Sequence, residues 1–540
     1  MLPHRATNRL VAGLLAIQFA GAALGQNYLA KAGNDVPHRG VYEVELECSG
    51  TAANPFLDVH LYVTFTTPGG SRITAEGFYD GGRIYRARAY ARELGVWRWH
   101  SQSNNPGLDN KTGSFRVVPS TLRGKLRVHP TDRHQFAYDN GAWFLHIGDT
   151  GYRYLVATEP KWQPYVDEAA ASGITKIRTW FAQSRSTVEA LFENGKGMAL
   201  PYWQEMERRI VYALDRHPDL ILQLIPYAED TAVINRYAAG DRWAQFVAEY
   251  AQARWSAFPN VQWTMTNDRE IVREGALQGR AVAWSTIDRM GKDMAQREPW
   301  GTLITNHQMR FSGYDFVDSE WSSFITIEDL DQVAGTRILE YRAKGRTPVV
   351  LDEDRYELYR NPSNRRYFFR RLMWASLLSG GHATYGGLRT FERYDESGVT
   401  GVAGYYTANR EGVLQQGAHD FVQIHKFFRD GGISLVGMTP DDSLTGADST
   451  RWKCIYDGKA FIVYIANPDG KDPATDNPAA SAATVEIQLP QGHYTTRWFN
   501  PRTGRWHDAA DVDGGVQKLT APIWPTATTG EDWVLLLRGR

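Results

Sequence analysis

The middle of the chain carries DLILQLIP at residues 219–226 and NVQWTMTN at residues 260–267, two short runs rich in apolar residues. Runs of this length, bounded by Pro, Asp and Asn, are typical of strands that are buried on both faces. Between them, aromatic and apolar residues recur at helical spacing from Trp243 to Trp255. The stretch therefore indicates a strand, a helix and a second strand, which is the repeating unit of a parallel sheet.

The same alternation of short apolar runs with helical periods extends well beyond this unit. The further strand candidates are residues 143–147, 174–180, 302–305, 316–318, 349–351 and 383–385. Eight strand–helix units in about 300 residues are typical of a (β/α)8 TIM barrel. We therefore predict an α/β chain whose barrel occupies residues 120–430.

The segments on both sides of the predicted barrel are patterned as β-structure. In the N-terminal segment, apolar and more polar residues alternate from Leu57 to Phe65 at the period of two that indicates a half-buried strand, with Leu57, Val59, Leu61, Val63 and Phe65 on the apolar face. Short runs separated by Gly, Pro and Asp continue this pattern in both segments. We predict β-sandwiches over residues 34–119 and 431–540. A chain of 540 residues is long enough for these three domains.

The composition excludes some partners and leaves others open. The formal net charge is −1 and no long basic run is visible, which argues against nucleic acid as a partner. Aromatic residues make up 12% of the chain. They can fill β-sandwich cores, or they can line a groove for a flat, hydroxylated ligand, and the composition does not distinguish these uses.

The N-terminus has the pattern of an export signal. Basic side chains precede the apolar run LVAGLLAIQFAGAAL at residues 10–24, which is too short to span a bilayer and suits a signal peptide better than a buried helix. We predict a signal peptide over residues 1–25, cleaved after Gly25, so that the protein is periplasmic or secreted. We expect no transmembrane segment. Cys48 and Cys454 are predicted to be buried free thiols, with their oxidation state left open.

Several classes of enzyme lack their motifs here. The sequence has no HExxH, no CxxC, no P-loop and no G-x-S-x-G. A zinc protease, a nucleotide-dependent enzyme and a lipase are therefore disfavoured, and we expect neither a metal nor an organic cofactor.

Polar residues follow four of the predicted barrel strands, where the active site of a TIM barrel lies. They are Asp149 after the first strand, Asn267 and Asp268 after the fourth, Asn306 and His307 after the fifth, and Asp352, Glu353 and Asp354 after the seventh. Glycoside hydrolysis needs two carboxyl groups across the scissile bond. Strands four and seven can place two carboxyls about 5 Å apart, the spacing of retaining enzymes.

Each candidate also has a structural interpretation. Asp149 and Asp268 could cap helices, Asp352 and Asp354 could cap or be solvated, and Glu353 could mark an exposed turn. His307 and His382 are expected to orient other groups by hydrogen bonds rather than to bind a metal. Aromatic residues near strand ends could belong to the core or could stack on sugar. They are Trp180, Phe181, Tyr227, Trp321, Tyr356 and Tyr385.

Four motifs occur in an order that resembles a known family. They are GKLRVHPTDRHQFAYDNGAWFLHIGDT at 124–150, WTMTND at 263–268, PVVLDEDRYE at 348–357 and LMWASLLSGGHATYGG at 372–387. Together they resemble the apiosidase-like TIM-barrel glycoside hydrolases. The flanking sequences NPFLDVHLYVTF and TTRWFNPRTGRW resemble, respectively, an N-terminal β-sandwich of uncharacterised role and a C-terminal domain type named after collagen binding. That name does not establish collagen binding here.

The resemblance implies a retaining mechanism in which Asp268 is the acid/base and Glu353 the nucleophile, while Asp149 hydrogen-bonds sugar hydroxyls. The chain departs from the family at Thr266-Asn267, in the acidic neighbours of Glu353, and over residues 315–324, so apiose specificity stays open. We expect further substrate contacts from several residues near the strand ends. They are Trp180, Tyr227, Asn267, His307, Trp321, Tyr356 and Tyr385.

The resulting expectation is an exported retaining glycoside hydrolase acting on a plant or algal polysaccharide or its oligosaccharides. An exo-acting furanosidase of apiosidase type and an endo-acting polysaccharidase both remain open. The alternative from another class is a carbohydrate- or matrix-binding protein whose barrel has lost activity. The sugar, the linkage, the oligomeric state and the work of the two sandwiches are not determined by the sequence.

Overall fold

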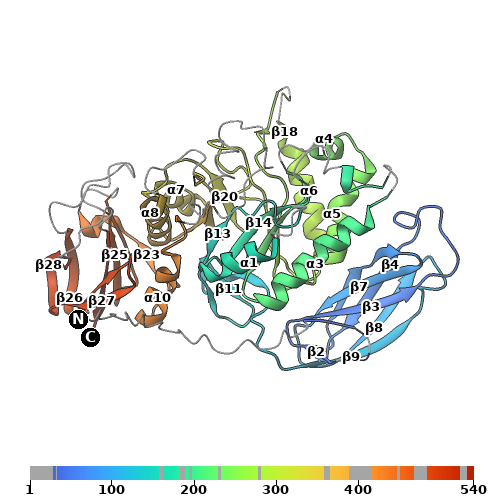
Figure 1. Ribbon diagram of the computed structural model, residues 1–540, viewed down its shortest axis with the longest axis horizontal. Coiled ribbons are helices and arrows are strands. Elements are labelled where there is room, and N and C mark those ends of the chain that lie inside the picture. Colours follow the sequence, from blue (N-terminus) through green and yellow to red (C-terminus); the bar gives the residue numbers. More distant parts are fainter. Residues whose placement is uncertain are drawn as a thin grey trace, which may run out of the picture.

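The structure is a computed structural model, and it describes residues 28–540 except 32, 34, 157–161, 183–188, 194–196, 229–232, 276, 278–280, 358–364, 388–415, 447–450, 467–482 and 523–531. The predicted signal peptide, residues 1–25, lies outside the described residues. Figure 1 shows three parts in a row, with the central barrel between an N-terminal and a C-terminal β-domain.

Eight parallel strands form the central sheet. In sheet order they are β19 (Ile304–Thr305), β16 (Val261–Thr264), β15 (Ile221–Ile225), β14 (Lys176–Trp180), β13 (Ile147–Asp149), β22 (His382–Tyr385), β21 (Val349–Glu353) and β20 (Ile325–Glu328). The end strands are joined by Ser323 N, which donates to Ile304 O at 2.8 Å, and by Thr305 Oγ1, which donates to Phe324 O at 2.6 Å. The predicted TIM barrel is confirmed.

The prediction of the first strand is wrong at its start. Residues Trp143–Phe144 form β12, which pairs with β11 (Asp132–Tyr138) in a separate three-stranded sheet with β10 (Leu126–His129). Phe136 and Phe144 from this sheet pack against Val350, near the start of β21. The small sheet therefore covers the N-terminal end of the barrel, and the first barrel strand begins only at Ile147.

The prediction of the sixth strand, at residues 316–318, is also wrong. The Phe316 ring stacks on Trp284 with 5.7 Å between centroids and also contacts Trp321, so this short segment packs against α6 (Trp284–Gln296). The sixth strand is β20, the β-branched run that follows. This shift places a carboxyl that the sequence analysis did not consider, Glu328, at the active end of the barrel.

Helices surround the barrel in the described part of the chain (Figure 1). Besides α6 they are α1 (Trp162–Ala171), α3 (Leu200–Arg216), α4 (Val233–Ala238), α5 (Arg242–Trp255), α7 (Thr336–Lys344), α8 (Arg365–Leu378) and α10 (Phe421–Gly431). The predicted helix between the two decisive strands is α5. It begins after Asp241, whose carboxylate accepts from the backbone N–H of Trp243 and of Ala244. Among the described helices, none combines the length and apolar character needed to cross a bilayer.

The N-terminal domain consists of two sheets, as a sandwich requires. One contains β1 (Leu29–Ala30), β3 (Val41–Glu47), β7 (Ile84–Tyr90) and β6 (Phe78–Gly81), and the other contains β2 (Val36–Pro37), β9 (Thr112–Val118), β8 (Gly95–Ser103), β4 (Leu61–Thr66) and β5 (Arg72–Glu76). The predicted alternation is confirmed from Leu61 to Phe65, because Leu61, Val63 and Phe65 are buried in β4, but its start is wrong, because residues 57–60 precede the strand. Cys48 is a buried free thiol, as is Cys454 in the C-terminal domain.

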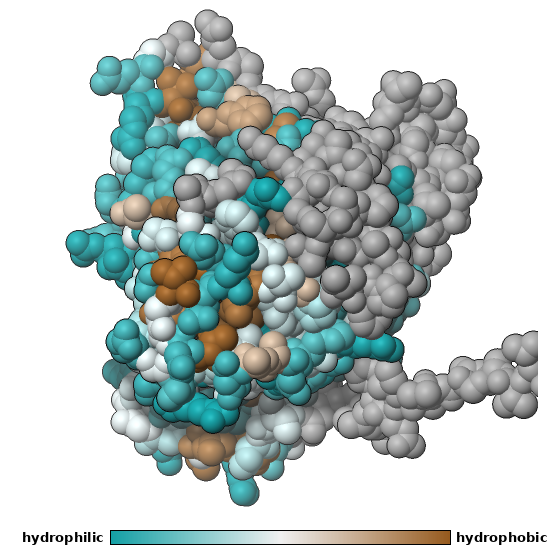
Figure 2. Space-filling model, turned by 90° about the vertical axis from the view of Figure 1, so that its left-hand side faces the viewer, coloured by the Kyte–Doolittle hydropathy of each residue, from teal (hydrophilic) through white to brown (hydrophobic). Residues whose placement is uncertain are grey.

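The C-terminal domain is β-rich, and a single long strand connects its two parts. It contains β23 (Thr439–Pro440), η1 (Asp442–Thr445), β24 (Trp452–Tyr456), β25 (Ala460–Ile465), β26 (Thr484–Asn500), β27 (Arg505–Asp508), β28 (Val512–Thr520) and β29 (Trp533–Gly539). A register shift between Leu489 and His493 lets β26 pair first with β28 and then with β29. Figure 2 looks onto this end of the molecule, where the described apolar residues form small separate groups on a mainly hydrophilic surface.

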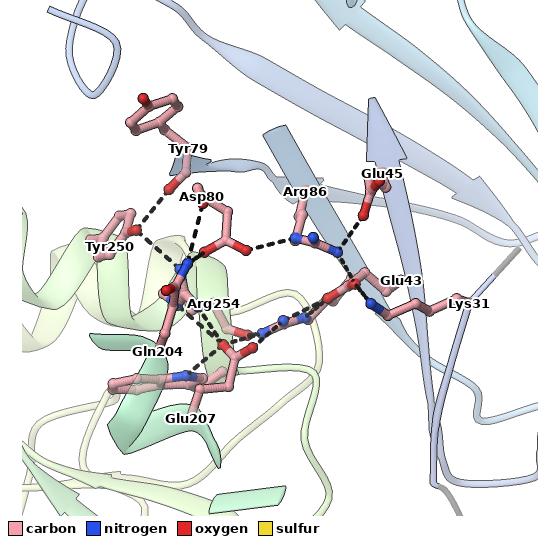
Figure 3. A network of polar contacts seen from close by, with 12 residues as sticks. Lys31, Glu43, Glu45, Tyr79, Asp80, Arg86, Gln204, Glu207, Tyr250 and Arg254 are labelled. Atoms are coloured by element: carbon pink, nitrogen blue, oxygen red, sulfur yellow. Dashed lines mark hydrogen bonds and ion pairs between the residues drawn. The ribbon is translucent and has the colours of Figure 1, made fainter. Parts of the chain in front are cut away.

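Buried ion pairs fix the N-terminal sandwich to the barrel (Figure 3). Arg88 on β7 pairs with Glu43 on β3 and with Glu207 on α3, each at 2.6 Å. Glu207 also pairs with Arg254 on α5 at 2.8 Å, and Arg254 reaches Asp80 of the sandwich at 2.7 Å. The side chains of Arg88 and Arg254 are fully buried, so the two domains share one polar core.

We expect Glu207→Gln to lower the free energy of unfolding by about 3–5 kcal/mol, because it leaves two buried guanidinium groups without their common carboxylate. Glu205→Gln, the same change at a half-exposed carboxylate of the same helix, should cost less, about 1 kcal/mol, because its partner Arg208 is exposed and Arg209 keeps its hydrogen bond to Tyr154 O. Thermal and denaturant unfolding of both variants measures the difference. Equal effects would contradict the shared polar core.

Candidate active site

A layer of polar side chains crosses the inside of the barrel, centred on Asp352 of β21. Lys176 of β14 forms a buried ion pair with this carboxylate, Gln223 Nε2 donates to it at 2.8 Å, and Thr384 Oγ1 donates to it at 2.7 Å. Burial alone would raise the pKa of Asp352, but Arg178 and Lys176 hold it well below its usual range. Asp352 is therefore a buried, permanently charged anchor, and not the capping or solvated residue that the sequence also allowed.

Arg178 connects this anchor to the groups above it. Its Nε lies 3.3 Å from Asp352 Oδ2, and its Nη1 donates to the backbone oxygen of the same residue at 2.5 Å. At the other end of the guanidinium, Nη1 lies 3.3 Å from Glu353 Oε2 and Nη2 donates to Asn267 Oδ1 at 2.5 Å. The arginine thus fixes a predicted nucleophile and a predicted substrate contact relative to one another.

Glu353 ends β21 and is 6% exposed, so it is not the exposed turn residue that the sequence left possible. The Tyr152 hydroxyl donates to its Oε2 at 2.5 Å, and the Tyr356 hydroxyl donates to its Oε1. Burial raises the pKa of Glu353, Arg178 opposes this, and the nearby Asp268 carboxyl adds to it, with a net upward shift. Two tyrosines and one arginine therefore hold this carboxyl in a fixed orientation.

Asp268 follows β16 with a backbone φ of +57°, a left-handed conformation that Asp tolerates better than most residues. The chain does not enter a helix here, since Arg269 instead forms a parallel bridge with Gln308. The alternative that Asp268 caps a helix is therefore wrong. One oxygen of its side chain lies within 4.8 Å of an oxygen of the Glu328 carboxyl.

Glu328 completes a group of carboxyls at the ends of β16, β20 and β21. It is 3% exposed, and Arg310 Nε donates to its Oε1 at 2.8 Å. Burial, followed by the neighbouring Glu353 and Asp268, raises the pKa of Glu328 to about 11. Because these carboxyls titrate together, the high pKa belongs to the group as a whole: one proton is retained among them at neutral pH, whichever carboxyl carries it.

His307 lies beside these carboxyls and is neutral. Burial and the nearby Arg178 lower the pKa of His307 to about 3, and neither ring nitrogen has a hydrogen-bond partner among the described residues. Its Nε2 lies 3.9 Å from Glu353 Oε2. Donor atoms of Asp268, His307 and Glu328 lie within 4.8 Å of one another, close enough for a cation by distance alone. Arg310 already supplies a positive charge to this cluster, and we assign no metal to it.

Two further predicted residues lie at the same end of the barrel. Asp149, fully buried at the end of β13, accepts from the Tyr165 hydroxyl at 2.7 Å. Trp180 stacks on Tyr152 with 4.3 Å between ring centroids, and both rings belong to one apolar cluster with Tyr356. Trp180 and Tyr356 therefore form an aromatic wall behind Glu353.

The structure does not bring the other predicted aromatic residues to this group. Tyr227 donates to Ala244 O on α5 at 2.8 Å, and Tyr385 donates to Glu357 while its ring packs against Phe369 of α8. The Trp321 indole donates to Asp288 of α6 at 3.0 Å. The hydroxyl or indole N–H of each thus donates to a group other than Asp268, Glu328 and Glu353. Phe181 packs against Trp203 of α3, and His382 Nε2 lies 3.3 Å from His134 O.

Sequence reasoning missed Tyr152, Arg178, Arg310 and Glu328. One signal was available, because Lys176, Arg178 and Trp180 alternate along a strand buried on both faces. Charged residues at alternate positions of such a strand must meet opposite charges inside the barrel. Tyr152 and Arg310 lie in loops, where the sequence carries no comparable signal.

Comparison with known families gives one match for each part of the chain. The family described as "Apiosidase-like, catalytic domain" matches residues 130–432, which is more than half of the chain. The "Domain of unknown function (DUF5060)" matches residues 36–104, and the "Putative collagen-binding domain of a collagenase" matches residues 477–538. No protein of curated function matches the chain significantly.

Solved structures share the fold. A crystal structure from Bacteroides vulgatus, named a "putative glycoside hydrolase", covers 94% of this chain and 100% of its own, at 17% identity and a TM-score of 0.72. A protein named a glycoside hydrolase family 5 member, from the same organism, covers 77% of this chain and 94% of its own, at 16% identity and a TM-score of 0.61. At these identities the likeness concerns the arrangement of the chain.

The same Asp→Asn change can be made at Asp352 and at Asp354, two buried residues at the end of β21, and its effects on stability can be compared. Asp354 accepts from the backbone N–H of Asp331 and of Gln332, each at 2.9 Å, and burial raises its pKa to about 7. We expect Asp352→Asn to lower the free energy of unfolding by about 3–5 kcal/mol at pH 7, because Lys176 and Arg178 lose their counter-charge. Asp354→Asn should cost less, about 1–2 kcal/mol, because no ion pair is lost and only one of the two backbone N–H groups loses its acceptor.

The pH dependence of the two variants should differ in sign. The folded pKa of Asp352 is depressed, so its stabilising effect is present above the ordinary aspartate pKa of about 3.9 and fades at lower pH. The folded pKa of Asp354 is raised, so its carboxyl costs stability as the pH rises toward 7. Denaturant unfolding between pH 2 and 8 covers both ranges, below pH 4 for Asp352 and between pH 4 and 8 for Asp354. Parallel curves for the two variants would contradict the assignment.

Proposed function

Because the chain belongs to the apiosidase-like family of catalytic domains, we propose that it is a glycoside hydrolase with Glu353 as nucleophile and Asp268 as acid/base. The observation that carries this proposal is the group of carboxyls at the C-terminal ends of β16, β20 and β21. In this group, two tyrosine hydroxyls orient the Glu353 carboxyl, and the Asp268 carboxyl lies next to that of Glu328. Glycoside hydrolysis requires such a pair, one ionised and one protonated.

In the first step, an ionised Glu353 oxygen attacks the anomeric carbon while the glycosidic C–O bond breaks. Arg178, 3.3 Å from Oε2, favours the ionised form, and the tyrosine hydroxyls fix the direction of the attacking oxygen. Asp268 gives its proton to the departing oxygen, so that the leaving group departs as an alcohol. The product of this step is a glycosyl ester on Glu353.

In the second step, Asp268 removes a proton from a water molecule, and the resulting oxygen attacks the anomeric carbon. The ester bond breaks, the sugar leaves with retained configuration, and Glu353 and Asp268 return to their starting protonation states. Asn267 and Asp149 would hydrogen-bond sugar hydroxyls, and Trp180 would contribute apolar surface to the subsite. No step requires a metal or an organic cofactor.

The substrate we propose is a plant or algal polysaccharide or its oligosaccharides, cleaved outside the cytoplasm after export directed by residues 1–25. The family supports exo-action on a terminal furanose such as apiose, and endo-action on a polysaccharide is the second candidate. A binding protein without activity is disfavoured, because burying several carboxyls beside one another costs stability that binding alone does not require.

We expect the mature protein to release reducing sugar from at least one member of a panel of pectic, arabinan, galactan and algal polysaccharides. On that substrate, Asp268→Asn should lower kcat/KM by about 10²–10⁴-fold, the usual contribution of a general acid. Glu353→Gln should reduce it further, because no covalent intermediate can form. An aryl glycoside with a good leaving group should largely restore the first step in Asp268→Asn but not in Glu353→Gln.

Asp318→Asn and Glu320→Gln provide matched controls, since both carboxyls are exposed on the segment before β20. Both control variants should retain wild-type activity. Full activity in Glu353→Gln would exclude it as the nucleophile, and a failure of the wild-type protein on the whole panel would favour the binding-protein alternative.

A further inference from the structure

The contact between Asp268 and Glu328 joins two carboxyl groups. They come from different strand ends, after β16 and in β20, and one oxygen of each lies within 4.8 Å of the other. Glu328 is 3% exposed, and two ionised carboxylates this close repel one another strongly where water is largely excluded. The proximity of the two groups therefore favours one proton shared between them.

The charged groups around the pair decide where that proton lies. Arg310 donates to Glu328 at 2.8 Å and favours the ionised form of Glu328. Glu353 faces Glu328 from β21, and its negative charge opposes full ionisation of the pair. His307 is neutral, and the cations Lys176 and Arg178 contact Asp352 in the layer below. A proton on Asp268, with Glu328 ionised beside Arg310, fits all of these charges.

We propose that Glu328 is a positioning residue that shares one proton with Asp268 and thereby keeps Asp268 in its acid form at neutral pH. This inference rests on the proposed function, in which Asp268 protonates the leaving group. An isolated aspartic acid ionises near pH 4 and would be an acid in only a small fraction of molecules at pH 7. The negative charge of Glu328 disfavours ionisation of Asp268 and so keeps the proton that the leaving group needs.

The shared proton also fits the complete reaction. When Asp268 gives its proton to the departing oxygen, both carboxyls of the pair become ionised and repel one another. Removal of a proton from the incoming water then restores the singly protonated pair. The repulsion makes Asp268 a stronger base in the second step than an isolated aspartate would be, so one contact serves both steps.

The proposal predicts an effect on stability that requires no substrate. Because the folded pair releases its last proton at higher pH than the same groups in the unfolded chain, it costs stability as the pH rises from about 4 through neutrality. Glu328→Gln removes this cost. The difference in Tm, variant minus wild type, should therefore increase between pH 5 and pH 9. Asp268→Asn should show the same increase, and the double variant should show no more than either.

The second readout is the pH profile of kcat/KM on the substrate found in the polysaccharide screen. In Glu328→Gln, Asp268 loses its negative neighbour, so the alkaline limb should move to lower pH by at least about one unit. The maximal rate should fall less than in Asp268→Asn, because the acid itself is still present. For Glu320→Gln, at an exposed position, the difference in Tm from wild type should not vary with pH, and the alkaline limb of the kcat/KM profile should stay in place.

The possible outcomes separate the two claims. A rising Tm difference together with a displaced alkaline limb supports the proposal. A Tm difference that is flat with pH in both single variants, or an unmoved limb, overturns it. If the Tm difference rises but Asp268→Asn retains wild-type activity, the shared proton stands while its catalytic use, and the proposed role of Asp268, are overturned.

Discussion

The ion pairs of Asp352 with Lys176 and Arg178 are the interaction on which the active end of the barrel depends. All three side chains are fully buried, and removing such charges from water costs several kcal/mol per ion unless the remaining donors and acceptors are paired. Gln223 and Thr384 complete that pairing, so the layer holds together only as a whole. Through Arg178, it sets the positions of Glu353 and Asn267 above it.

Two adjacent carboxyls of one strand are thereby given opposite electrostatic environments. Asp352 faces two cations and is held ionised, whereas Glu353, the next residue, faces Asp268 and has a raised pKa. The layer around Asp352 thus has its charges balanced by Lys176 and Arg178. In the layer above it, Asp268, Glu328 and Glu353 lie too close together for all three carboxyls to be ionised at once. Groups whose environments push their pKa values apart are what acid–base chemistry requires. On β21, Asp352 therefore stabilises the barrel, and the next residue, Glu353, takes part in the proposed reaction.

The sequence was sufficient for the barrel and for its main carboxyls, because buried parallel strands are recognisable as apolar runs and their ends meet at one edge. It failed for Glu328, because the short segment at 316–318 resembled a strand and was preferred to the β-branched run at Ile325–Glu328. It also failed for Tyr227 and Tyr385, because proximity to a strand end does not determine which face a side chain takes. The Tyr227 hydroxyl donates to Ala244 of α5, and the Tyr385 ring packs against Phe369 of α8, so both side chains turn toward the surrounding helices. The contacts made by Arg178 and Tyr152 join distant parts of the chain and are visible only in three dimensions.

In the proposed mechanism, Glu353 attacks the anomeric carbon and Asp268 assists both steps. Proton NMR of the reaction mixture during the first turnovers on a cleaved oligosaccharide, before the released sugar equilibrates between its anomers, identifies the configuration of the product. Two successive displacements at the anomeric carbon predict that the first sugar released has the same anomeric configuration as the bond that was cleaved. Release of the opposite anomer would show a single displacement by water and would contradict the assignment of Glu353 as the nucleophile.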